Sequence, residues 1–422
     1  MGDKTFADKE LAGEMGSFKE PGVRLKQVEG EGASSFADGD LEKALFLGMQ
    51  QLALAKLCYE EPNTKDKEVM MAQAHYNLSV IYYEMGLGDQ SLYHAQKALE
   101  RVDPRKTGEG ENNNFTVSCM MAIARAMIQR SDPKCVNFLQ RALVVNHELN
   151  GPDHDSNFRI HEGFGDFYVL LGDSRALYKA TTAKKDTSVD VNAKKKQEPD
   201  DYEKAMDEYA TAYSKIAGGG KATAFYGGLG STKDARMGDM FGHAAKTRSK
   251  MGNDNEAAVI YEKAVACLES ASKPNKAKIA QMCYELGATY HKAKQYSYSK
   301  NALDRGLGYC SGIARPDGES DPILMLLKKQ QAITMYDGNE VENARKTFEE
   351  LLALQKKEYG GNSVIVAETL KYLGDVHVAL KNKPLASKFY NRALKILRKR
   401  LGSIDQTVKQ LEQYIKQLNL KD

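Results

Sequence analysis

The hydrophobic positions of residues 367–400 predict two helices joined by a short turn. Leu373 and His377 fall at helical spacing in the first helix, and residues 382–384 interrupt the pattern. The apolar positions of the second helix are Ala386, Phe389, Tyr390, Ala393, Leu394 and Leu397. Several of these side chains are small and Gly374 has none, so the two helices can pack closely as an antiparallel pair.

This order of large, small and aromatic positions recurs along the chain. Eight copies begin near residues 25, 72, 116, 158, 238, 280, 325 and 367. A two-helix unit of this kind cannot bury its apolar face alone, so neighbouring units must stack. We therefore predict an all-α solenoid of about eight helix-turn-helix repeats. Residues 403–420 add an amphipathic helix, which we expect to cap the array.

The repeated unit resembles the tetratricopeptide repeat. With Ala367 as position 1, the sequence places Leu373 and Gly374 at positions 7 and 8, Tyr390 at position 24 and Ala393 at position 27. The copies that begin at residues 72, 116 and 158, and those from 238 onwards, lie 42 to 45 residues apart, which is longer than the common form of the repeat. The resemblance implies a right-handed superhelical solenoid.

Two finer resemblances suggest a function. The segment EYGGNSVIVAETLKYLGD is similar to the connection between repeats in kinesin light chains, which implies peptide binding in a concave groove. Residues 52–100 and 356–397 resemble the tetratricopeptide repeat protein 23 family, which implies a non-enzymatic scaffold located in cilia. The groove asparagine typical of kinesin light chains occurs only at Asn77. Tyr76 and Val80 stand where a clamp for chaperone tails needs Lys and Asn, so we do not expect that activity.

The repeats and the segments between them predict the domain organisation. Residues 1–22 form a flexible tail, and residues 23–217 form a first array with an insertion at about 178–199. Residues 218–234 are rich in glycine and connect this array to a second one, residues 235–401. No phosphate-loop motif fits the glycine-rich segment, so we do not expect it to bind a nucleotide.

Composition narrows the class of protein. The 60 basic and 57 acidic residues give a net charge of +3, which argues against nucleic-acid binding by bulk charge. No apolar run is long enough to span a membrane, and residues 1–13 lack the apolar core of a secretory signal. The six cysteines form no C-x-x-C pair, which favours reduced thiols in the core. We therefore expect a cytoplasmic protein.

Two segments concentrate positive charge. The insertion carries Lys184, Lys185, Lys194, Lys195 and Lys196, and the second helix of the last repeat carries Lys388, Arg392, Lys395, Arg398 and Lys399. The insertion is either a solvated loop or a basic arm that holds an acidic partner. The last repeat therefore has a basic second helix, which offers a second docking surface for a partner.

Motifs for catalysis or metal binding are absent from the sequence. His147, His154 and His161 are spaced by seven, but Gly151 interrupts any common helix and no further ligand completes a zinc set. Neither H-E-x-x-H nor G-x-S-x-G occurs. We expect no enzyme activity, no cofactor and no metal.

The resemblance instead points to a binding surface on the first helix of each repeat. In this fold, positions 2, 5, 9 and 12 line the concave face. The residues so placed are Gln73, Tyr76, Val80, Tyr83, Tyr284, His291, Lys329, Tyr336, Lys371 and Asp375. Tyrosine offers a large contact area with a polar tip, which suits a partner interface, although some of these side chains can instead pack between repeats.

Two hypotheses remain for the function. In the first, the chain is a structural scaffold of a ciliary axoneme or another microtubule-associated assembly, and its basic segments contact tubulin, whose tails are acidic. In the second, the chain is a transient adaptor that takes a cargo or signalling peptide in its groove. Other proteins are the expected partners in both, and the location is then the cytoskeleton, a cilium or an axoneme.

Overall fold

The computed structural model describes residues 21–57, 65–108, 110–182, 200–217, 234–310 and 322–418, and these ranges contain helices and no strand. The chain divides into two compact units, unit 1 from Met1 to Lys233 and unit 2 from Asp234 to Asp422. The predicted basic insertion, with Lys184, Lys185, Lys194, Lys195 and Lys196, lies outside the described residues.

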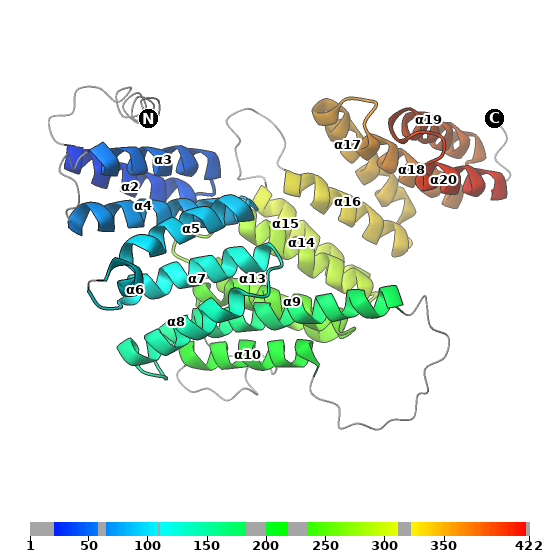
Figure 1. Cartoon of the computed structure of the whole chain (residues 1–422). Coiled ribbons are helices and arrows are strands. Elements are labelled where there is room, and N and C mark those ends of the chain that lie inside the picture. The colour runs from blue at the N-terminus through cyan, green and yellow to red at the C-terminus, as the bar shows by residue number, and fades with distance from the viewer. Residues whose placement is uncertain are drawn as a thin grey trace, which may run out of the picture. The chain divides into compact units, whose positions relative to one another are not determined.

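Unit 1 contains four helix pairs in chain order (Figure 1). The pairs are α2 (Pro21–Ala37) with α3 (Leu41–Leu57), α4 (Lys65–Glu84) with α5 (Gly88–Val102), α7 (Asn114–Gln129) with α8 (Cys135–Asn150), and α9 (Phe158–Thr182) with α10 (Asp201–Ile216). A short helix α6 (Pro104–Thr107) and a 3₁₀ turn η1 (Asp155–Asn157) lie in the connections. The second helix of each of the first three pairs also packs on the first helix of the next pair.

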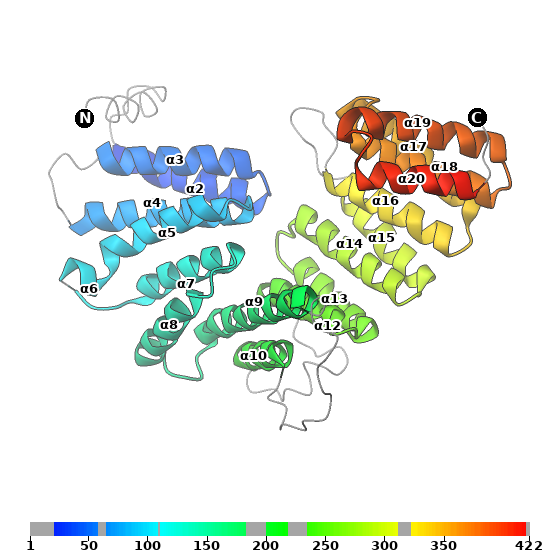
Figure 2. The ribbon, with the colours of Figure 1, turned by 45° about the vertical axis from the view of Figure 1, so that its right-hand side comes forward.

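Unit 2 repeats this arrangement. A 3₁₀ turn η2 (Ala235–Met237) precedes α12 (Gly238–Lys250) with α13 (Asp254–Glu269), α14 (Lys276–Lys292) with α15 (Tyr296–Cys310), α16 (Pro322–Asp337) with α17 (Val341–Tyr359), and α18 (Val364–Ala379) with α19 (Lys383–Leu401). The last helix, α20 (Gln406–Gln417), lies beside α19 (Figure 2) and buries Val408 and Leu411 in the core. Within the described residues, the predicted all-α fold with eight helix pairs and a final helix is confirmed.

A left-handed residue ends the first helix in seven of the described pairs. The residues with positive φ are Gly39, Gly86, Ser131, Gly252, Lys294, Asn339 and Lys381. This conformation lets the main chain fold back on the helix, so that the Asn382 N–H donates to the His377 carbonyl at 2.8 Å. The repeated turn geometry keeps these seven pairs antiparallel.

The small and aromatic positions of the sequence meet inside the pair formed by α18 and α19. Tyr390 is fully buried, and a Cβ atom added at Gly374 would lie 2.5 Å from its ring. The tyrosine hydroxyl donates a 2.6 Å hydrogen bond to Asp375. The same arrangement of a glycine, the aspartate that follows it and a tyrosine occurs at Gly165, Asp166 and Tyr209 and at Gly172, Asp173 and Tyr202. We call this arrangement the Gly-Asp-Tyr latch.

The helix that precedes the insertion, α9, is longer than the other described helices. It has 25 residues and ends at Thr182, whereas no other described helix has more than 20. Gly172 packs against the ring of Tyr202 there, and Arg175 forms a 3.0 Å ion pair with the buried Asp201. These contacts with α10 stabilise the additional turns. The boundaries of the tail, the insertion and the glycine-rich connection stay predictions.

The cysteines of the described residues are buried and carry free thiols, as the sequence predicted for core positions. They are Cys119, Cys135, Cys267, Cys283 and Cys310. Burial raises the pKa of the Cys119 and Cys283 thiols to about 12, so both stay protonated at neutral pH. These side chains contribute to packing.

Candidate functional site

The first helices of three consecutive pairs enclose a hollow of about 460 Å³ in unit 1. We call this hollow the inner groove, because it lies on the side formed by α4, α7 and α9. Its wall includes Tyr76, Val80 and Tyr83 from α4, Asn114, Ser118, Met121, Ala122 and Arg125 from α7, and Arg159, Glu162, Gly163 and Asp166 from α9. The predicted residues Tyr76, Val80 and Tyr83 therefore do line a common cavity.

Arg125 places a positive charge in the wall of the inner groove. The Cζ atom of its guanidinium lies 4.5 Å from the centre of the Tyr83 ring, which is a cation–π contact. Burial disfavours the charge on Arg125, but Tyr83 and the carboxylates of Glu162, Glu84 and Asp166 outweigh burial and raise the pKa of the guanidinium. Burial also raises the pKa of the Tyr83 hydroxyl. The groove thus holds a permanent cation against an aromatic ring.

Two carboxylates of α9 balance this charge. Glu162 is buried and forms a 2.7 Å ion pair with Arg159, whose side chain remains 42% exposed. Asp166 accepts a 2.7 Å hydrogen bond from the Tyr209 hydroxyl in a Gly-Asp-Tyr latch. The inner groove therefore presents both signs of charge beside apolar side chains such as Met121, a combination that suits a polypeptide ligand.

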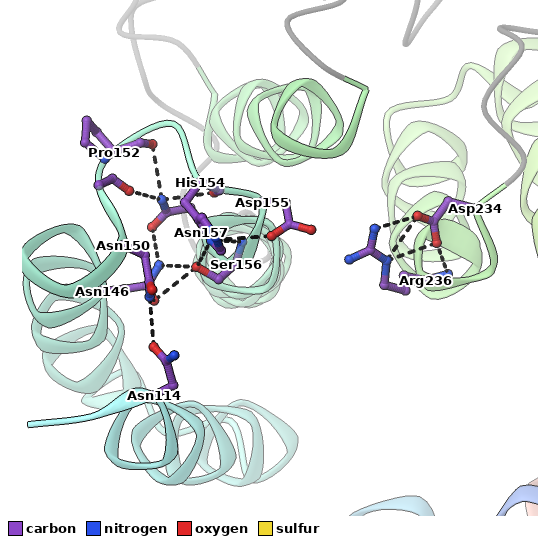
Figure 3. A network of polar contacts seen from close by, with 11 residues as sticks. Asn114, Asn146, Asn150, Pro152, His154, Asp155, Ser156, Asn157, Asp234 and Arg236 are labelled. Carbon is purple, nitrogen blue, oxygen red and sulfur yellow. Dashed lines mark hydrogen bonds and ion pairs between the residues drawn. The ribbon is translucent and has the colours of Figure 1, made fainter.

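A network of amide side chains supports part of the groove wall (Figure 3). Asn146 donates to the side-chain oxygens of Ser156 and Asn157 at 2.9 and 2.8 Å. Asn150 donates to Asn114 at 2.8 Å and so ties α8 to α7. The fully buried Asn157 donates to the main-chain oxygens of Gly151, Pro152 and His154. These bonds fix the start of α9, the helix that carries Arg159 and Glu162.

A second hollow of about 300 Å³ adjoins the inner groove and shares Tyr76 and Val80 with it. Its other apolar lining residues are Val28, Gly32, Ala33, Phe36, Ala44, Gly48 and Ile81. Because small side chains and glycines leave space between larger apolar ones, this hollow suits an apolar side chain of a ligand. The inner face of unit 1 therefore combines an apolar hollow with a charged one.

Gln73 has a different environment from the two tyrosines predicted with it. Its side-chain amide donates to Asn77 at 3.0 Å, and Asn77 donates to Gln51 of α3 at the same distance. Gln73 and Asn77 thus belong to a hydrogen-bonded series of side-chain amides that links α4 to α3. Gln73 does not line the inner groove.

Most residues predicted for the concave face of unit 2 form polar contacts with other residues of the same unit. His291 lies 2.8 Å from Asp337, and Lys329 forms a 2.6 Å ion pair with Glu368. Tyr336 donates to the Asp375 main chain at 3.5 Å, and Asp375 accepts from Tyr390. Tyr284 is half-buried beside the core, whereas Lys371 is exposed. These pairs tie consecutive repeats together, which is the alternative that the sequence left open for such side chains.

The basic residues predicted on the last second helix lie on the surface of α19. Lys388, Arg392, Lys395, Arg398 and Lys399 are all exposed. Arg398 forms a 2.8 Å ion pair with Glu412 of α20. Arg392, Lys395 and Lys399 instead line a surface hollow of about 640 Å³.

Sequence reasoning missed the inner-groove residues of α7 and α9, including Arg125, Arg159, Glu162 and Asp166. Glu162 occupies position 5 of its repeat, a position that the concave-face rule names, so the rule could have found it. Arg125 occupies position 10, which the rule omits. Its long side chain reaches the groove from the flank of α7, because an arginine head group can lie far from its Cα atom.

The described residues show no arrangement for metal chemistry or membrane spanning. No group of three His, Cys, Asp or Glu side chains there could hold a metal ion. His161 lies 2.7 Å from Glu208, and His154 accepts a hydrogen bond from the Ser156 main chain, so both have structural partners. No helix in the same ranges is long and apolar enough to cross a membrane.

Comparison with known protein families supports the repeat assignment in part of unit 2. Residues 327–399, from α16 to α19, match the family described as a tetratricopeptide repeat. No curated protein sequence matches the chain. Among solved structures, a Rap protein complexed with competence and sporulation factor is 11% identical and covers 83% of this chain and 88% of its own, with a TM-score of 0.40. The TPR domain of P58(IPK) is 10% identical and covers 94% of this chain and 98% of its own, with a TM-score of 0.27.

The resemblances to kinesin light chains and to the tetratricopeptide repeat protein 23 family find no match in these comparisons and stay predictions. The repeat family matches in unit 2, and the same paired-helix geometry with Gly-Asp-Tyr latches occurs in both units. Repeats of this kind generally serve as protein-interaction modules and not as catalysts. The described residues therefore form an all-α fold of stacked helix pairs, and residues 327–399 of this fold match the tetratricopeptide repeat.

Proposed function

We propose that the chain is a non-enzymatic protein-interaction scaffold that takes a peptide segment of a partner in the inner groove of unit 1. The observation that carries this proposal is the 460 Å³ hollow lined by Tyr83, Arg125 and Arg159. A bound main chain can donate to the carboxylates and accept from the guanidinium groups, while its side chains contact Met121 and the adjoining apolar hollow. This corresponds to the adaptor hypothesis from the sequence.

The test selects ligands from a displayed peptide library on the full chain and measures the binding of one selected peptide by calorimetry. Ala122→Arg fills the groove from a half-exposed position and should weaken binding about tenfold or more. The matched control, Gln140→Arg on the exposed surface of α8, should leave binding unchanged. Equal affinity of the wild-type and Ala122→Arg chains for every selected peptide would rule out the groove as the binding site.

A second candidate function is a structural role in a microtubule-based assembly such as a ciliary axoneme. The exposed basic residues of α19 favour it, since a scaffold on an acidic filament needs an exposed cationic face. The resemblance to the tetratricopeptide repeat protein 23 family supports the same location. Tagged protein in a ciliated cell should remain with axonemes after detergent extraction. Complete release with the soluble fraction would contradict this candidate.

A further inference from the structure

The surface helix α19 has an unusual charge composition. Its 19 residues include seven basic residues and no acidic residue. Four of the basic residues, Lys388, Arg392, Lys395 and Lys399, recur at spacings of four, three and four, which places them on one side of the helix. All four are exposed. We call this row the α19 stripe.

The charges of the stripe are not neutralised within the described part of unit 2. Other basic side chains there have acidic partners, as Arg398 has Glu412 and Lys328 has Glu350, both at 2.8 Å. No described carboxylate forms an ion pair with any of the four stripe residues. Like charges three or four residues apart repel each other and destabilise a helix slightly. A bound anion would relieve this repulsion.

Favourable interaction with the helix dipole explains only some of the basic positions of α19. Cations stabilise the last turn of a helix, where Arg398, Lys399 and Arg400 lie. The effect does not extend beyond that turn, so it does not explain Lys388, Arg392 or Lys395. These positions need another reason to carry positive charge.

The stripe borders a hollow that supplies further hydrogen-bond donors. Arg392, Lys395 and Lys399 line a cavity of about 640 Å³ together with Asn362, Asn391 and the buried Ile396. Arg400 donates a 2.8 Å hydrogen bond to the Asn362 carbonyl, which holds the α17–α18 connection against α19. Cations and amide groups thus converge on one shallow surface, an arrangement that matches carboxylate oxygens.

We propose that the α19 stripe and its hollow bind an acidic, extended segment of a partner protein. Lys388 and Lys399 are separated by about 16 Å along the helix, and about five residues of an extended chain span the same length. A run of about five glutamates or aspartates therefore matches the stripe in length and in charge.

A nucleic acid is the other polyanion of this size, and the surface fits it less well. Proteins that hold single strands stack bases on exposed aromatic rings. The nearest aromatic residue on α19, Phe389, is half-buried and stacks on His377 with 5.3 Å between ring centres. The described stripe therefore offers donors for carboxylates and no ring for a base.

The test measures the fluorescence anisotropy of a labelled decaglutamate peptide with the full chain at low salt. The triple variant Arg392→Glu, Lys395→Glu and Lys399→Glu should weaken binding about tenfold or more. The control reverses three exposed lysines elsewhere in unit 2, Lys273, Lys276 and Lys346, and should change binding by about twofold or less. Circular dichroism checks that both variants remain folded.

The inference stands apart from the peptide site of unit 1, so Ala122→Arg should leave decaglutamate binding unchanged. Equal weakening by the triple variant and its control would reduce the effect to net charge and overturn the site. Tighter binding of a ten-nucleotide single-stranded RNA, lost in the same triple variant, would overturn the class of ligand. Failure of the wild-type chain to bind decaglutamate at low salt would overturn both the proposed site and the proposed class of ligand.

Discussion

The hydroxyl of Tyr390 donates a 2.6 Å hydrogen bond to Asp375, which links the second helix of the last repeat to the first. Tyr390 is fully buried, and its ring lies over Gly374, the residue that precedes the aspartate. Burial raises the pKa of Asp375 even though Tyr390 and Lys371 act in the opposite direction. The latch therefore joins a packing contact that needs glycine to a hydrogen bond that needs tyrosine.

Tyr390→Phe should lower the free energy of unfolding of unit 2 by about 1 to 3 kcal/mol, because a buried acceptor loses a donor while the ring contact remains. Urea unfolding followed by circular dichroism measures the change. The matched control is Tyr298→Phe, since the Tyr298 side chain is largely exposed. Equal effects of the two substitutions would show that the Asp375 hydrogen bond contributes nothing specific.

The latch also shows how much of the fold the sequence could predict. Gly374 and Tyr390 stand at repeat positions 8 and 24, so their contact follows from helical spacing and the small-to-large pairing of two helices. The inner groove is harder to predict from helical spacing. Arg125 lines the groove because its side chain is long, and the spacing of positions along a helix does not indicate this.

Side-chain pairing in unit 2 limited the prediction in a different way. The spacing placed His291 and Lys329 on the concave face, but it could not indicate that Asp337 and Glu368 of neighbouring repeats would engage them. Such pairs depend on the offset between stacked helices, which is set by the core packing of both repeats. Sequence position therefore predicts the face of a helix better than it predicts the availability of a side chain.

Lys381→Gly should raise the free energy of unfolding of unit 2 by about 0.5 to 1 kcal/mol. Lys381 has a φ of 57°, and glycine adopts this left-handed conformation without the steric cost of a Cβ atom. Gly252→Ala, in a turn where glycine already has a φ of 83°, should have the opposite effect. Thermal unfolding of both variants checks whether Lys381→Gly stabilises the fold and Gly252→Ala destabilises it. Destabilisation by Lys381→Gly would contradict the prediction.

Arg141→Met should destabilise unit 1 by about 3 to 5 kcal/mol, because it leaves the buried Asp103 carboxylate without its cation. Two guanidinium nitrogens of Arg141 donate to Asp103, one of them at 2.8 Å, and the backbone of Arg105 donates at 3.1 Å. Burial disfavours the carboxylate charge, but these donors outweigh burial and lower its pKa.

The double variant Arg141→Met and Asp103→Asn separates the penalty for an unpaired charge from the loss of the contact itself. It should be more stable than Arg141→Met alone, because the unpaired charge is absent. Urea unfolding at pH 7 compares the two chains. Equal or lower stability of the double variant would contradict the account of Asp103 as a buried anion that depends on Arg141.

His75 and His94 predict a pH dependence of unit 1. Their Nδ1 atoms are 2.9 Å apart, so one ring donates a hydrogen bond to the other. Burial lowers the pKa of His75 to about 3, with further contributions from His94, Arg101, Lys56 and Lys97, and burial lowers the pKa of His94 to about 4. In the unfolded chain both pKa values return to about 6.5.

The unfolded state therefore binds more protons than the folded state as the pH falls below 6.5, and stability decreases in that direction. The stabilisation by the neutral pair is fully present above pH 6.5. It should decrease by about 1 to 2 kcal/mol for each histidine between pH 6.5 and pH 5. The substitutions His75→Gln and His94→Gln together keep hydrogen-bonding amides at both positions and remove the titration. Urea unfolding across this range should give a flatter curve for the double variant than for the wild-type chain, whereas parallel curves would show that carboxylates alone cause the acid sensitivity.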